Sequence, residues 1–114
     1  MLSFSVADYI TRHHDLSILA KQMHSLGDPT MQMAFDDMDV CWADAVKDLS
    51  PSPAFIIDRT WNGNFNDDAI GLECGKSVSW VKHTRHDSFE ILDQYYRNRL
   101  QLDLMPFARK KRGG

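Results

Sequence analysis

Residues 50–58 read SPSPAFIID, and the fold class depends on how this stretch is interpreted. Pro51 and Pro53 lack backbone donors and restrict the residue before them, so a helix arriving from the N-terminal side ends here. The apolar run that follows, residues 54–58, is short and continuous, which is typical of a strand buried on both faces. The stretch therefore predicts a change from helices to strands.

The chain before this stretch is predicted to begin with a helix over residues 5–26, where apolar residues recur every three or four positions. Ser5 and Asp8 have the spacing of a capping box, with Asp in place of Glu. Gly27 is a good C-terminal stop. A break near residues 13–14, which would give two helices instead of one, stays open.

A second helix is predicted over residues 29–49, which carry one apolar stripe. Asp28 is a natural N-cap, and Pro29 suits the first helical position. Because the link between the two helices is short, we expect them to pack as an antiparallel hairpin.

The chain after the stretch is predicted to form a β-hairpin. Residues 69–74 and 77–83 have the character of strands, and Gly75-Lys76 would join them as a two-residue turn. Asn62-Gly63 is a further turn signal. Together with residues 54–58, these strands would make a small antiparallel sheet.

The last predicted element is a helix that Asp87 caps, with Glu90 at the capping-box spacing, and that Pro106 ends. The expected fold is therefore α+β in the order ααβββα: an N-terminal helical hairpin, a small three-stranded antiparallel sheet and a C-terminal helix. We expect a single domain over residues 1–106 and a flexible basic tail over residues 107–114.

Composition narrows the class of protein. The chain has 114 residues, 43% hydrophobic and 25% charged, which is typical of a folded domain. Cys41 and Cys74 are too few for a secreted disulfide scaffold, so we expect reduced thiols, with a bridge between them as an open alternative. Residues 1–15 lack the features of a signal peptide, and the chain has no window suited to spanning a bilayer. A cytoplasmic protein is expected.

Carboxylates suggest the first functional hypothesis. The chain has fourteen Asp and only two Glu, and several Asp crowd the second predicted helix with Lys47 as the only offsetting cation on that face. Such a face suits a basic or nucleic-acid-binding protein partner, or else is a solvated surface. An aromatic loop follows, whose side chains form either a contact surface or part of the core. The partner-binding candidates are Asp36, Asp37, Asp44, Asp48, Trp61 and Phe65.

A histidine cluster supports a different hypothesis. His83, His86 and Asp87 could hold zinc with Cys74 as a fourth ligand, or supply an acid–base group, which would make the chain a small metal-dependent enzyme. The alternative is a solvated turn. His13 and His14 point about 100° apart on a helix and cannot easily share an ion.

The basic run at the C-terminus suggests a third hypothesis, contact with nucleic acid, although an acidic body would repel phosphate. Its residues are Arg109, Lys110, Lys111 and Arg112. The first hypothesis is favoured: a small acidic, non-enzymatic binding protein, of the build shared by inhibitors and by immunity or counter-defence proteins, with no cofactor and no metal. The oligomeric state stays open, a homodimer included.

Overall fold

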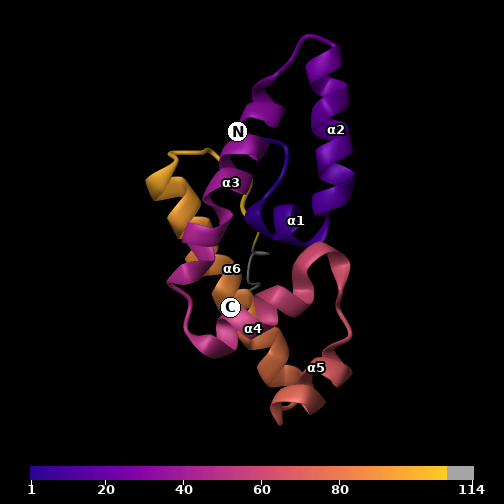
Figure 1. Cartoon of the computed structure of the whole chain (residues 1–114), viewed down its shortest axis with the longest axis vertical. Helices are drawn as coiled ribbons and strands as arrows, with labels where there is room; N and C mark the ends of the chain where they lie inside the picture. Colours follow the sequence, from indigo (N-terminus) through magenta and orange to yellow (C-terminus); the bar gives the residue numbers. More distant parts are fainter. Residues whose placement is uncertain (108–114) are drawn as a thin grey trace, which may run out of the picture.

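A computed structural model describes residues 1–107 and shows helices joined by short links (Figure 1). The elements are α1 (Val6–Thr11), α2 (His13–Ser25), α3 (Thr30–Lys47), α4 (Pro51–Thr60), the 3₁₀ turn η1 (Trp61–Gly63), α5 (Asp67–Cys74) and α6 (Val78–Arg99). Residues 1–107 contain no strand, only one isolated parallel bridge between Ser5 and Met105. The predicted α+β fold, with its three-stranded sheet, is therefore wrong, and the fold is all-helical.

The stretch SPSPAFIID forms the start of α4 instead of a strand. Pro51 and Pro53 lie in the first helical turn, where backbone N–H groups have no partner inside the helix, so their missing donors cost nothing. The two isoleucines of the stretch face different parts of the core: Ile57 packs in the main cluster, and Ile56 packs with Ile70 and Val81 in a smaller one. Burial on two sides of a helix explains why the run is apolar without a visible period.

The predicted β-hairpin is also wrong, because its residues lie in α5 and in the first turns of α6. Gly75 has a φ of 70°, the left-handed conformation that ends α5, and the Lys76 N–H donates to the Gly71 carbonyl at 2.8 Å. Ser77 then caps α6, its hydroxyl oxygen accepting from the Trp80 N–H at 3.1 Å. Asp87, predicted to start the last helix, lies within it.

Most of the N-terminal predictions are confirmed. The exception is the start of the second helix, where the N-cap is Pro29 and not Asp28, whose carboxylate accepts from the Thr30 N–H at 3.2 Å. Ser5 and Asp8 form a reciprocal capping box at 3.1 and 3.2 Å. The open alternative of a break is realised at Arg12, between α1 and α2. Gly27 follows α2 with a φ of 97°, and α3 begins at Thr30, one residue later than predicted. Helices α2 and α3 then pack side by side as an antiparallel pair (Figure 1).

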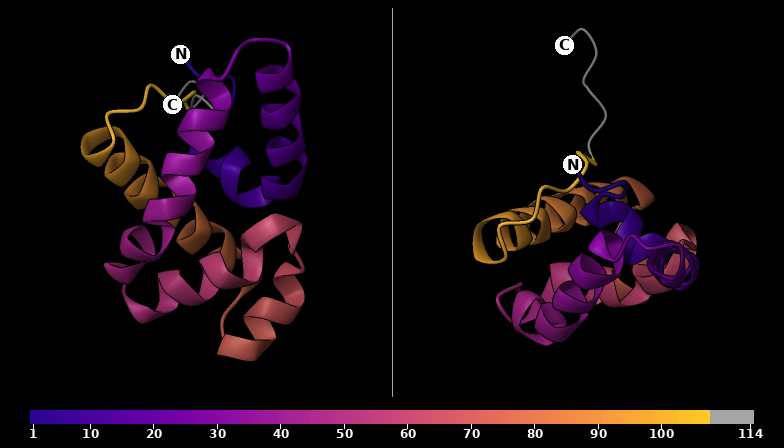
Figure 2. Two further views of the ribbon diagram at one scale, coloured as in Figure 1. Left: turned by 45° about the horizontal axis from the view of Figure 1, so that its top comes forward. Right: turned by 90° about the horizontal axis from the view of Figure 1, so that it is seen from above.

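Helix α6 connects the two ends of the molecule. It packs against α3 at one end and against α4 and α5 at the other, an arrangement that Figure 2 shows from two further directions. Beyond α6 the chain runs back beside the N-terminal segment, where the Leu2 N–H donates to the Asp103 carbonyl at 2.7 Å and the Met105 N–H to the Phe4 carbonyl at 3.1 Å. This pairing places residues 101–103 next to α3.

The predicted tail begins at Phe107, whose ring lies 5.9 Å from the Phe89 ring and 5.5 Å from that of His86. Phe107 is thus packed against α6. Residues 108–114, the rest of the predicted tail, lie outside the described part of the chain.

Gly71 provides a test of the α5–α6 arrangement. A Cβ atom at this position would lie 2.6 Å from the Lys76 carbonyl oxygen, a backbone atom that cannot rotate away. Gly→Ala inside a helix ordinarily stabilises by about 1 kcal/mol, but here the clash reverses the sign. We expect Gly71→Ala to lower the free energy of unfolding by about 1–3 kcal/mol, measured by urea denaturation followed at 222 nm. A stabilised variant would contradict the close approach.

Candidate functional site

Four of the predicted partner-binding residues lie on the outward side of α3. Since successive residues of a helix are rotated by about 100°, the four carboxylates fall within an arc of about 120° around the helix axis. They belong to Asp36, Asp37, Asp44 and Asp48. Two apolar side chains share this arc: Met33 is 62% exposed and Val40 is 83% exposed. We call this surface, made of the four aspartates with Met33 and Val40, the acidic face.

The carboxylates of the acidic face are not equivalent. Asp44 accepts from the Tyr95 hydroxyl at 2.5 Å and pairs with Lys47 at 3.0 Å, and Arg99 lies 3.8 Å away. The hydrogen bond from Tyr95, followed by Lys47, lowers the pKa of Asp44 below its usual value. The two cations balance the acids at the C-terminal end of α3, so Asp44 is already engaged within the protein.

The other end of the acidic face keeps its negative charge. Asp36 accepts from the neutral Gln32 amide at 2.7 Å, and Asp37 forms no hydrogen bond or ion pair through its side chain within residues 1–107. Both residues are exposed. Uncompensated charge is therefore concentrated on Asp36 and Asp37, between the exposed Met33 and Val40.

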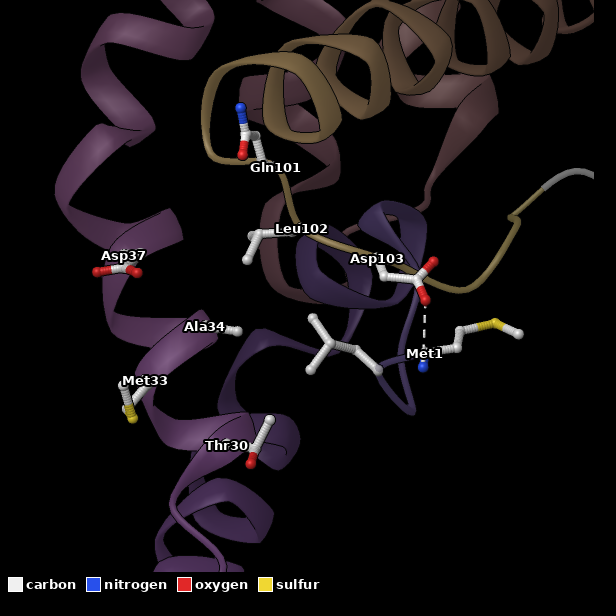
Figure 3. Close-up of a pocket in the computed structure, with 9 residues that line it drawn as sticks. Met1, Thr30, Met33, Ala34, Asp37, Gln101, Leu102 and Asp103 are labelled. Atoms are coloured by element: carbon white, nitrogen blue, oxygen red, sulfur yellow. Dashed lines mark ion pairs between the residues drawn. The ribbon is translucent and has the colours of Figure 1, made fainter.

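A groove adjoins this charged end (Figure 3). It has a volume of about 440 Å³ and lies between α3 and the segment that follows α6. Ala34 and Leu102 face it from opposite sides, and Asp103, across from α3, pairs with the Met1 amino group at 3.2 Å. Its lining residues are Met1, Leu2, Thr30, Met33, Ala34, Asp37, Gln101, Leu102 and Asp103. Met33 and Asp37 thus belong to both the groove and the acidic face.

The two aromatic candidates are separated. Trp61 is half-buried, with its ring centre 4.4 Å from that of Trp42 and 4.6 Å from that of His13. Phe65 is exposed and covers the Arg85 guanidinium at 5.3 Å. Trp61 therefore contributes to the core, the second of the two alternatives that the sequence left open, and neither residue belongs to the acidic face.

Sequence reasoning missed a cluster on the flank of α3. One carboxylate oxygen of Asp39 accepts from the buried Tyr9 hydroxyl and also lies 3.0 Å from His13 Nε2. Burial, then the bond to Asp39, raises the pKa of Tyr9, so its hydroxyl remains a donor. The cluster ties α1 and α2 to α3. The sequence carries no local signal for it, because Tyr9, His13 and Asp39 lie on three different helices.

Only two of the four predicted zinc ligands, His86 and Asp87, lie close together. Within residues 1–107 the group of potential ligands is His86, Asp87 and Glu90, whose donor atoms lie within 4.8 Å of one another and which are all exposed. His83 Nδ1 lies 3.1 Å from the Ser79 carbonyl oxygen, and the Cys74 thiol donates to the Ile70 carbonyl at 3.1 Å. His83 and Cys74 thus lie outside that group.

The remaining candidates concern cysteines, membranes and the tail. Cys41 on α3 and Cys74 on α5 are unbridged. Among the helices of residues 1–107, none is both long and apolar enough to cross a membrane. The tail candidates Arg109, Lys110, Lys111 and Arg112 lie outside the described residues, so contact with nucleic acid stays a prediction.

Comparison with known proteins gives no further assignment. No protein-family model matches the chain, and neither a curated protein nor a solved structure is significantly similar to it. The chemistry of the acidic face and its groove is therefore what points to a function.

Proposed function

We propose that this protein is a non-enzymatic binding protein that docks onto a basic surface of a protein partner through the acidic face of α3. The observation that carries the proposal is the position of two exposed apolar side chains, Met33 and Val40, around the uncompensated carboxylates of Asp36 and Asp37. Binding surfaces characteristically combine apolar anchors with a polar, charged rim.

Electrostatics would supply the specificity and much of the association rate. Carboxylates at the N-terminal part of α3 attract a basic surface, and they repel acidic ones. The body of the protein carries the same sign of charge, which favours basic partners, including nucleic-acid-binding proteins whose basic surface would be covered. Inhibition by occupancy of such a surface in the cytoplasm is the mode of action that we propose.

A charge-matched pair of variants tests the proposal. The double variant Asp36→Asn with Asp37→Asn neutralises the acidic face, and Asp15→Asn with Asp68→Asn removes the same charge from exposed positions on α2 and α5. Each immobilised protein is exposed to a lysate of the organism that encodes it, and the captured partner is identified and titrated. We expect the first double variant to bind the partner about tenfold or more weakly, a loss of about 1.4 kcal/mol.

The control double variant is expected to bind like the original protein, and added salt is expected to weaken binding because exposed charges are screened. Circular dichroism establishes that both variants keep their helices. Equal affinities for the two double variants would overturn the proposal.

A further inference from the structure

The groove beside α3 carries an inference about the shape of the partner, and it rests on the proposed function. We infer that the acidic face accepts a basic amphipathic helix, which lies along α3, places an apolar side chain in the groove and directs lysine or arginine toward Asp36 and Asp37.

Apolar surface defines the path of such a helix. Met33 and Val40 lie seven positions apart on one side of α3, the heptad spacing at which helices pack against each other. Ala34 offers a small side chain at the edge of the groove, where a partner can approach the α3 backbone closely. Met33 lines the groove and is also one of the two exposed residues, so apolar surface extends from the groove onto the acidic face.

The groove has room for an anchor residue. Its volume of about 440 Å³ exceeds that of a leucine or phenylalanine side chain, and its walls come from Leu2, Met33, Ala34 and Leu102. The wall opposite α3 is held to the N-terminal segment, because the Leu2 N–H donates to the Asp103 carbonyl at 2.7 Å. An apolar side chain entering the groove would therefore meet a formed site.

The negative charge beside the groove indicates that the partner is positively charged there. Asp37 lies on the groove and on the acidic face, and Asp36 lies beside it, with no cation paired to either within residues 1–107. Lys47, on the same helix, and Arg99, on α6, are engaged by Asp44 instead. A partner complements these uncompensated carboxylates and the groove beside them when it carries cations next to an apolar side chain. A basic amphipathic helix has this arrangement.

Designed peptides test the inference without knowledge of the partner. The probe is a helical peptide of about 18 residues, roughly five turns, with leucine on one face and lysine on the other. One control peptide replaces lysine with glutamate, and a second replaces leucine with serine. Affinities are measured by fluorescence anisotropy, and amide chemical shifts of the full chain map the contact.

We expect saturable binding of the leucine–lysine peptide, with shifts concentrated in residues 30–40 and 101–103 and little binding of either control peptide. Met33→Ser and Val40→Ser are expected to weaken binding about tenfold each, equal to about 1.4 kcal/mol. Leu72→Ser, at a leucine that is 85% exposed on α5, is the matched control and is expected to have no effect.

The outcomes separate this inference from the proposed function. The inference of a helix anchored in the groove is wrong if the control peptide with serine in place of leucine binds as well as the leucine–lysine peptide. It is also wrong if Met33→Ser and Val40→Ser leave the affinity unchanged. In either case the proposed function stands so long as Asp36→Asn with Asp37→Asn weakens capture of the partner. If the leucine–glutamate peptide binds equally, or the shifts map elsewhere, the inference is wrong. If Asp36→Asn with Asp37→Asn captures the partner as well as the control double variant does, both proposals are wrong.

Discussion

Arg85→Ala is expected to lower the free energy of unfolding by about 3–5 kcal/mol, because it removes one member of a buried ion pair. The Arg85 side chain is 9% exposed and pairs with Asp67, which is 15% exposed. Its Nε also donates to the Thr60 hydroxyl at 2.8 Å. The variant would leave the Asp67 carboxylate without its counterion in a nearly dry site, and the link between α4, α5 and α6 would be lost. Urea denaturation measures the effect.

Arg59→Ala is the matched control for this prediction. Arg59 has the same chemistry, since it pairs with Glu73 at 2.8 Å and lies over the Phe55 ring at 4.4 Å. Its partners are exposed to water, where the ions are solvated well without each other. We expect a much smaller loss for Arg59→Ala, and equal losses for the two arginines would contradict the importance of burial.

Tyr9→Ala is expected to cost about 3–5 kcal/mol, the range for truncating a large buried aromatic side chain. Tyr9 is fully buried, and its ring lies 5.3–6.1 Å, centre to centre, from those of five neighbours. These neighbours are His13, Phe35, Trp42, Trp61 and Tyr96. Alanine would leave a cavity where α1, α3, α6 and η1 meet.

Tyr9→Phe separates packing from hydrogen bonding. The ring stays in place and only the hydroxyl that donates to Asp39 is lost. We expect a smaller cost of about 1–2 kcal/mol, because the partly exposed Asp39 can recover a water molecule and keeps its contact with His13. The free energies of unfolding of both variants are compared by urea denaturation. If phenylalanine were as damaging as alanine, the packing explanation would be wrong.

The acidic face shows how far sequence reasoning reached toward the site. Because α3 is a regular helix with one apolar stripe, its period alone predicted that Asp37, Asp44 and Asp48 lie opposite that stripe. The period did not predict that Asp44 is engaged by Tyr95 and Arg99, which are far away in the chain. The groove also had no local signal, because its walls come from α3 and from both ends of the described chain.

What the sequence by itself determined about this protein is the helical N-terminal half. The capping box of Ser5 and Asp8 and the stop at Gly27 were readable because caps depend on residues three or four positions apart. What only the tertiary structure decided is the second half. A five-residue apolar run fits a strand or a helix equally, and Gly75 can turn a hairpin or end a helix. Helices formed there because they bury Ile56, Ile70 and Val81 together and bring Arg85 to Asp67, contacts between residues that no short window of sequence contains.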